Sequence, residues 1–387
     1  MATLSVQQVL HAGFARLCAT YGVRKTVIRW AYSVLACRTS VLGGHVWRCP
    51  QGHEQRVVYN SCKHRACPQC ASLDRERWLE RMRRLLALAC GYHHVVFTVP
   101  HELNELWSWN RSWFADQVLA AARETMLQLL GQERWLGALP GLVLSWQTWS
   151  RTLLRHLHVH LLATAGGWTA TGWKSLKHDY LVPTKVLRSV YRGKLRSRLL
   201  AGLSSGEMVL PQGWSAADVG RLLKALYRKE WCVHVQPRYR HGQGVMTYLG
   251  RYVRGGPLRE HQLLSLTATQ VTFRYTDHHD HRTKPLSLPI EDFLLRLSDH
   301  VPDPGFHVVR YAGLYATGNR DLLSQARAQL GMAPPEEAPK LTAQDYLERL
   351  GHGDQMTCSV CGRRYVQRET IERSGRSPPF QAYGRAA

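Results

Sequence analysis

The fold is decided by residues 147–167, which have the sequence QTWSRTLLRHLHVHLLATAGG. Two segments with the composition of β-strands, 141–149 and 156–164, are joined here by the short linker SRTLL. Such close spacing predicts an antiparallel hairpin that turns near Thr152 and Leu153. The rest of the domain is expected to build outward from this hairpin.

Three histidines, His156, His158 and His160, alternate along the second strand. Alternate residues of a strand share one face and lie roughly 7 Å apart, so two successive histidines can share one metal ion. Gln147, expected close to opposite His158, could supply an amide oxygen as a third ligand. Imidazole and amide oxygen together suit magnesium or manganese acting on phosphate. The alternative is a structural role for these histidines, with the apolar residues between them facing a core.

Strand-like and helix-like segments alternate on both sides of the hairpin. Further strands are expected at 92–99 and 232–237, and a second hairpin at 271–275 and 284–288. Helical patterns cover 73–88, 103–130, 184–200, 216–231 and 244–253. Strands interleaved with long helices predict an α+β fold, in which helices pack on a central antiparallel sheet.

The chain is strongly basic along its whole length. It has 51 lysines and arginines against 28 acidic residues, a formal net charge of +23. Self-repulsion on this scale favours a polyanionic partner, and nucleic acid is the expected one. A merely basic or ribosome-associated surface is the alternative. No stretch approaches the roughly 20 apolar residues of a membrane helix, and residues 1–8 lack the pattern of a signal peptide. We therefore expect a cytoplasmic protein with no membrane partner.

A dense group of cysteines and histidines predicts a small zinc-binding module over residues 45–75. The candidate ligands are Cys49, His53, Cys62, Cys67 and Cys70. Cysteine and histidine at such spacings hold structural zinc, and the metal stabilises a fold that has almost no apolar core of its own. Cys62 and His53 compete for the fourth position. The alternative is a set of thiols that bind no metal.

The remaining organisation follows from changes in composition. Residues 1–44 are expected to form a helical lead-in to the zinc-binding module, and residues 76–330 a single large domain. After residue 331 the segment MAPPEEAPK marks a linker, and 331–387 form a C-terminal tail. This tail carries a second cysteine pair, Cys358 and Cys361, which could complete a shared site, bind metal across a dimer, or bind none.

Two tyrosines four residues apart, Tyr248 and Tyr252, lie in the sequence GVMTYLGRYVRGG. On a helix this spacing puts both side chains on one face, roughly 6 Å apart at Cβ. Packing of the pair in a core is the ordinary explanation. The surrounding arginines and glycines favour a surface that a phosphate backbone can approach.

These motifs together resemble the insertion-sequence-91 (IS-91) transposase family. The 147–167 segment and the later TYLGRY resemble its HUH motif, here His158, Val159 and His160, and its double-tyrosine motif. The segments ACRTSVLGGHVWRCPQGH and YNSCKHRACPQC resemble its N-terminal zinc-binding domain. The resemblance covers roughly residues 35–320, with the motifs in the family's order.

The resemblance implies a central sheet of the HUH endonuclease type in the large domain, and a rolling-circle type of transposition. A divalent ion, Mg²⁺ or Mn²⁺, on His158, His160 and Gln147 would stabilise charge on the scissile phosphate. Tyr248 or Tyr252 would attack single-stranded DNA at the transposon ends, leave a 5′-phosphotyrosine, and later rejoin the strand to target DNA. The implied partners are these DNAs and host replication machinery, and the implied location is the bacterial nucleoid.

Two departures from the family pattern concern the metal ligands. The family commonly has a CxxCG knuckle where this chain has CPQGH, so His53 is expected to replace a cysteine. Relatives often have histidine at the position of Gln147. Rival functions are a plasmid or phage replication initiator with the same chemistry, a non-catalytic zinc-dependent DNA-binding regulator, and an inactive transposase copy.

Overall fold

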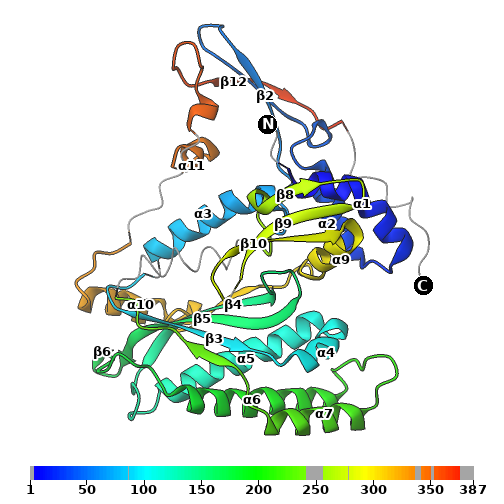
Figure 1. The fold of residues 1–387 in the computed structure, drawn as a ribbon. Helices are drawn as coiled ribbons and strands as arrows, with labels where there is room; N and C mark the ends of the chain where they lie inside the picture. The colour runs from blue at the N-terminus through cyan, green and yellow to red at the C-terminus, as the bar shows by residue number, and fades with distance from the viewer. Residues whose placement is uncertain are drawn as a thin grey trace.

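The computed structural model describes residues 4–85, 87–240, 256–277, 279–335, 341–349 and 353–374. Helices pack against antiparallel sheets, so the predicted α+β class is confirmed (Figure 1). The expected helix at 244–253, with Tyr248 and Tyr252, lies outside the described residues. None of the helices in the described parts of the chain combines the length and apolar character needed to cross a bilayer.

The central sheet has the strand order β11-β4-β5-β3-β7, and β6 pairs with the far end of β5. Its strands are β3 (Tyr92–Thr98), β4 (Leu139–Trp149), β5 (Arg155–Thr169), β6 (Gly172–Ser175), β7 (Val233–Val235) and β11 (Val309–Gly313). All neighbours in it are antiparallel. The predicted β4–β5 hairpin is confirmed, with its turn at residues 150–154, and Gln147 lies directly opposite His158.

One face of the central sheet is covered by helices that follow the strands in sequence. They are α4 (Asn104–Trp109), α5 (Arg111–Leu130), α6 (Thr184–Ser205) and α7 (Ala216–Arg228), drawn below the sheet in Figure 1. Helix α6 packs on the sheet through one apolar stripe. The stripe consists of buried residues at every fourth position, Leu187, Tyr191, Leu195 and Leu199. These side chains join the alternate apolar residues of β3, β4 and β5 in the largest core.

The helical region predicted over 103–130 is present as two helices, α4 and α5, because the chain breaks at Asn110. This residue leaves helical geometry, and its side-chain amide donates to the carbonyls of Leu106 and Val209. Its side-chain oxygen accepts from the Val209 amide at 2.8 Å. The break therefore ties α4 and α5 to the loop after α6, a contact that helical periodicity does not encode.

The opposite face of the sheet packs against two other helices. The helices α3 (Pro68–Leu85) and α10 (Arg320–Gln329) contribute to a smaller core with Val143 of β4 and Leu162 of β5. His158 and His160 lie on this same face, four and two residues before Leu162, respectively. The candidate metal ligands thus lie beside a helix-packed end of the sheet.

The N-terminal helices share a core with a distant part of the chain. Helices α1 (Val6–Thr20) and α2 (Lys25–Ala36) pack with α9 (Ile290–Asp299) and with a second sheet of order β10-β9-β8. The strands of that sheet are β8 (Leu263–Leu266), β9 (Gln270–Thr276) and β10 (Thr283–Pro289), and the last two form the second predicted hairpin. Gly13 allows close approach, since a Cβ there would lie 2.2 Å from Ile290 Cγ2.

A third sheet joins the two ends of the chain. Its strand order is β12-β1-β2, with β1 (Gly44–Arg48), β2 (Gln55–Tyr59) and β12 (Val366–Ile371). Helix α11 (Ala343–Arg349) precedes β12 and lies near α3 in space (Figure 1). Short 3₁₀ helices occupy Ser40–Leu42, His101–Leu103, Glu260–Gln262, Thr317–Asn319 and Gly353–Met356. The segment predicted as a tail thus contributes a strand beside the N-terminal module.

Candidate functional site

The predicted metal ligands gather on one face of the central sheet. Adjacent strands β4 and β5 place Gln147 opposite His158 and Ser145 opposite His160. All four side chains are buried, with exposed fractions of 2% for Gln147 and 7% for each histidine. The period-two spacing of the strand therefore delivers two imidazoles and one amide to a single sheltered patch.

The hydrogen bond of His158 shows which nitrogen of its ring carries hydrogen. Nδ1 lies 2.8 Å from the carbonyl oxygen of His156, which can only accept, so Nδ1 carries the hydrogen and donates it. In a neutral imidazole the other nitrogen then has a free electron pair. His158 Nε2 is therefore in the form that binds metals, and it lies 3.1 Å from His160 Nε2.

His160 is oriented by a histidine from the neighbouring strand, His94 of β3. Its Nδ1 lies 2.8 Å from His94 Nε2, and the two rings are stacked with centroids 5.0 Å apart. Burial, followed by the nearby His234, lowers the pKa of His94 to about 4. Burial, followed by the charges of His158 and His94, also lowers the pKa of His160 well below its ordinary value. Both rings are thus neutral near pH 7, and one hydrogen bridges them.

The sequence analysis did not identify His94. The signal was present in the strand YHHVVFTV, where alternation sends His93 and His94 to opposite faces. The missing information was the pairing of β3 with β5, which places Val96 opposite His160 and Leu162 opposite His94. That pairing joins strands separated by two helices and is not fixed by local sequence.

The nitrogen positions fit an octahedral divalent ion. Adjacent ligands at about 2.1 Å from such an ion are about 3.0 Å apart, which matches the 3.1 Å between the two Nε2 atoms. The amide of Gln147, opposite His158, adds an oxygen of the kind such ions prefer. The donor set therefore suits Mg²⁺ or Mn²⁺ with positions left for water or phosphate oxygens.

A basic pocket opens beyond the end of β4. Its volume is about 420 Å³, and Trp149, two residues after Gln147, lies in its wall with Arg151, Arg274 and Tyr275. Gly256 and Pro257 also line it, so the first described residues after the tyrosine segment lie at this pocket. An aromatic ring beside guanidinium groups is the surface that binds a base and its phosphate.

The positive potential of this pocket affects a histidine in its wall. Burial lowers the pKa of His261, and the adjacent Arg259 and Arg274 lower it further. Added positive charge is therefore disfavoured here, whereas a phosphate would be attracted.

The hairpin tip that carries Trp149 is fixed by His300, which follows α9. His300 Nε2 donates to the carbonyl of Leu153 at 2.9 Å, and Nδ1 then accepts from the hydroxyl of Thr148 at 2.9 Å. Leu153 has a φ of 62°, an uncommon value for a residue other than glycine, and its carbonyl is held by the bond from His300. The tip is consequently held against α9, which positions Trp149 and Arg151 at the pocket.

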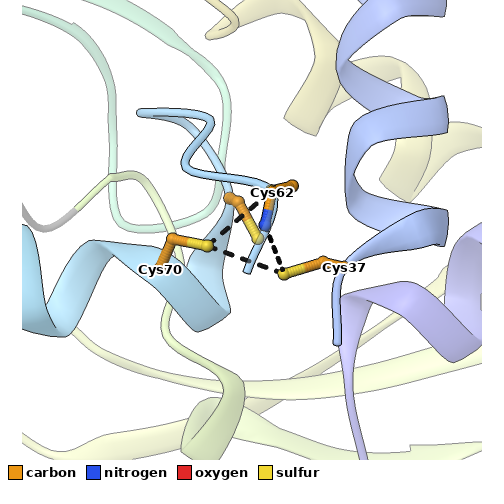
Figure 2. Close-up of side chains that lie close together, drawn as sticks. Cys37, Cys62 and Cys70 are labelled. Carbon is orange, nitrogen blue, oxygen red and sulfur yellow. Dashed lines mark hydrogen bonds between the residues drawn. The ribbon is translucent and has the colours of Figure 1, made fainter. Parts of the chain in front are cut away.

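The first cysteine cluster consists of Cys37, Cys62, Cys67 and Cys70, whose sulfur atoms lie within 4.8 Å of one another. Figure 2 shows Cys37, Cys62 and Cys70 converging from the end of α2, the loop after β2 and the first turn of α3. Cys70 Sγ lies 3.6 Å from Cys37 Sγ and 3.7 Å from Cys62 Sγ. A tetrahedral zinc ion with Zn–S bonds of about 2.3 Å requires sulfur separations of about 3.8 Å. The set therefore fits a closed, structural zinc site.

Hydrogen bonds from neighbouring thiols, that of Cys37 first, lower the pKa of Cys70. The Cys62 amide donates to Cys37 Sγ at 3.4 Å, and the His64 amide to Cys62 Sγ at 3.5 Å. Such amide donors stabilise thiolates, the form that binds zinc.

The predicted zinc-ligand set is divided between two places. Cys62, Cys67 and Cys70 lie in the first cluster together with Cys37, which the sequence analysis did not include. Cys49 and His53 lie in a second cluster with Cys358 and Cys361. The reason is the antiparallel β1–β2 pair, which carries Cys49 and His53 at its tip, away from the base where Cys37 and Cys62 lie. Nearness of Cys49 to Cys62 in sequence therefore does not bring them together in space.

Comparisons with known proteins match both parts of the chain. Residues 9–99 match the family described as "Transposase zinc-binding domain", and residues 141–321 match the family described as "Putative transposase". The chain is 32% identical to "Putative transposase y4qJ" of Sinorhizobium fredii (strain NBRC 101917 / NGR234), over 81% of this chain and 80% of that protein. It is 29% identical to "Transposase for insertion sequence element IS801" of Pseudomonas savastanoi pv. phaseolicola, over 92% and 87% respectively.

Proposed function

Since this chain belongs to the insertion-sequence-91 (IS-91) family of transposases, we propose that it cuts and rejoins single-stranded DNA through a covalent tyrosine–DNA intermediate. His158, His160 and Gln147 would hold a divalent ion, and Tyr248 and Tyr252 would be the nucleophiles. The observation that carries the proposal is the pair of Nε2 atoms 3.1 Å apart, with the Nδ1 of each ring engaged by His156 or His94.

A bound Mg²⁺ or Mn²⁺ would supply positive charge to a non-bridging oxygen of the scissile phosphate. The protein's part is to aim the two imidazoles at one point. The carbonyl of His156 and the ring of His94 do this through their hydrogen bonds to Nδ1. The carbonyl of His156 can only accept, so its bond selects the His158 tautomer with a free electron pair on Nε2. In the proposed site the ring of His94 would accept from His160 Nδ1 in the same way, as partners of metal-binding histidines usually do.

The proposed covalent step conserves the energy of the phosphodiester. The phenol oxygen of Tyr248 or Tyr252 forms a bond to phosphorus, while the bond from phosphorus to the 3′ oxygen breaks. The phenol loses its proton and the released 3′ oxygen gains one, leaving a 5′-phosphotyrosine and a 3′-hydroxyl. Attack by a 3′-hydroxyl on the tyrosyl phosphate reverses the step and joins strands without a nucleotide cofactor.

The basic pocket supports a single strand as the substrate. Trp149 offers a face for stacking, and Arg151 and Arg274 offer charge beside it. Bases stack on aromatic side chains only when they are unpaired, so this surface suits single-stranded rather than duplex DNA. The pocket adjoins both the end of β4 and the residues after the tyrosine segment, where a scissile phosphate would have to lie.

The test is a covalent-capture assay. Purified protein is incubated with single-stranded oligonucleotides from the flanks of its gene, with Mg²⁺ or Mn²⁺, and products are separated on a denaturing protein gel. A band shifted by attached DNA is expected, and it should disappear with EDTA, in the His158→Ala variant and in the Tyr248→Phe/Tyr252→Phe double variant. Stable DNA binding with no adduct at any flank would instead favour a DNA-binding regulator.

A further inference from the structure

We propose that Cys49, His53, Cys358 and Cys361 bind a second structural zinc ion, which fastens the C-terminal segment to the N-terminal module. The matched zinc-binding family region ends at residue 99, so two of these four ligands lie far outside it. The site is separate from the first cluster, because no cysteine belongs to both.

The ligand atoms have the spacing of a tetrahedral site. Cys49 Sγ lies 3.5 Å from Cys361 Sγ, and His53 Nδ1 lies 3.8 Å from Cys49 Sγ and 3.9 Å from Cys358 Sγ. The edge of a zinc–thiolate tetrahedron is about 3.8 Å, so one ion can contact all four atoms. Three sulfurs and one imidazole are a common structural zinc set, and all four positions are filled by protein atoms.

The two halves of the site have closely similar backbone geometry. The Cys49 amide donates to the Glu54 carbonyl, and the Gly52 amide donates back to the Cys49 carbonyl, both at 2.9 Å. In the same way the Cys358 amide donates to the carbonyl of residue 363, and the amide of residue 362 donates back to the Cys358 carbonyl, also at 2.9 Å. Residues 52 and 362 are glycines with φ of 79° and 68°, which lets each loop curl around its ligands. Two such metal-binding knuckles facing one another form the usual frame of a small zinc domain.

One knuckle is prepared to present a thiolate. The Gln51 amide donates to Cys49 Sγ at 3.4 Å. An amide donor of this kind stabilises the thiolate, which is the form that binds a metal.

The surroundings join the two knuckles but cannot stabilise them alone. The local core is very small, with Cys49, Cys358 and Tyr365 as its buried members. Glu54 accepts hydrogen bonds from the Tyr365 hydroxyl and the Ser359 hydroxyl, both at 2.6 Å. A core this size does not outweigh the loss of chain entropy on ordering, which is the situation in which small domains depend on a metal.

A disulfide explains the arrangement less well. A disulfide needs two sulfurs and would leave the third cysteine and His53 without a role, whereas zinc uses all four. Both knuckles also point their ligands at a common centre and not at one partner.

The experiment measures zinc per chain by inductively coupled plasma mass spectrometry on the purified full-length protein. Two zinc ions are expected in the wild type and one in the Cys358→Ser/Cys361→Ser variant. The matched control is Cys232→Ser, because Cys232 is an exposed cysteine in neither cluster; it should retain two. Two zinc ions in the double variant, or one in the wild type, would overturn the proposal, and so would an intact-mass measurement showing a disulfide within the set.

Cobalt substitution shows whether the variant has lost only the second site or its whole fold. In the Cys358→Ser/Cys361→Ser protein, Co²⁺ should keep the absorption of a four-sulfur site, since the first cluster is untouched. His53→Cys should keep two metal ions and convert the second site to four sulfurs, with stronger sulfur-to-cobalt charge transfer. An unchanged charge-transfer band in His53→Cys would contradict the assignment of His53 as a ligand. Neither measurement depends on DNA cleavage.

Discussion

Replacing His94 by alanine tests whether this residue sets the metal-binding form of His160. The change removes the hydrogen-bond partner that lies 2.8 Å from His160 Nδ1. Both rings are buried, with exposed fractions of 1% for His94 and 7% for His160. His160 can then adopt the tautomer with hydrogen on Nε2, which cannot bind a metal. We therefore expect weaker binding of Mn²⁺ with the ligands themselves intact.

The magnitude follows from the burial of that hydrogen bond. In His94→Ala the metal-binding tautomer of His160 has a buried Nδ1–H without its partner. A buried donor in this situation costs about 1–3 kcal/mol, so this tautomer becomes less stable by that amount. One factor of ten in a binding constant corresponds to about 1.4 kcal/mol, so the Mn²⁺ dissociation constant should rise about 10- to 100-fold. The same range is typical when the hydrogen-bond partner of a metal-binding histidine is removed.

The assay is titration with Mn²⁺ followed by electron paramagnetic resonance, with strand cleavage measured over the same metal concentrations. A positioning role predicts a higher metal requirement, with cleavage restored at saturating Mn²⁺. His94→Gln should recover part of the affinity, because its amide oxygen can accept from His160 Nδ1. His93→Ala is the control, since it removes an equally buried histidine of β3 that points to the other face of the sheet.

Wild-type Mn²⁺ affinity in His94→Ala, with an unchanged melting temperature, would refute the reasoning. Equal weakening in His93→Ala would also refute it, because the effect would then come from general damage to β3.

Other perturbations test the pocket, the hairpin anchor and the helix packing. Arg151→Ala/Arg274→Ala should weaken the binding of single-stranded DNA. The slope of log binding constant against log salt concentration should fall by about 1.4, since each lost phosphate contact contributes about 0.7. An unchanged slope would mean that DNA does not bind in this pocket. Burial, partly opposed by its hydrogen bond to the Leu153 carbonyl, lowers the pKa of His300 to about 4. In the unfolded chain His300 binds a proton near pH 6.5, whereas in the folded chain it stays neutral until about pH 4. Lowering the pH therefore favours the unfolded chain, and the free energy of unfolding should fall by up to about 3 kcal/mol between pH 7 and 4. Urea titrations of His300→Gln should show that its free energy of unfolding depends less on pH than that of the wild type. The same pH dependence in both proteins would contradict the low pKa of His300. Gly13→Ala should lower the melting temperature because its Cβ would strike α9, whereas Gly220→Ala, with open space around it, should raise it; a rise in both would contradict the close packing.

Features encoded by neighbouring residues could be predicted from the sequence. The β4–β5 hairpin and the pairing of Gln147 with His158 follow from a short linker and period-two alternation. The long helices were also predicted from local sequence, through the spacing of their apolar residues, apart from the break at Asn110. The roles of Gln147, His158 and His160 as ligands, and of Tyr248 and Tyr252 as nucleophiles, remain predictions.

Features that depend on contacts between distant segments could not be predicted. His94 becomes part of the site only through the pairing of β3 with β5. Cys37 and Cys361 join their clusters across long separations in the chain, while Cys49 and Cys62, close in sequence, are drawn apart by a β-hairpin. Cysteine spacing alone carries no information about which end of a hairpin a ligand occupies.

The pairing of β1 with β12 has a consequence for the order of events during protein synthesis. Strand β1 ends at Arg48, and its partner β12 begins at Val366, so about 320 residues are translated between them. At a synthesis rate of about 5–20 residues per second, β12 is made roughly 16 to 64 seconds after β1. Throughout this interval the edge of β1 that β12 later covers is exposed on the nascent chain, and an unpaired edge can recruit strands from other chains. Crowded polysomes translating this protein should therefore be the stage at which it is most prone to misassemble.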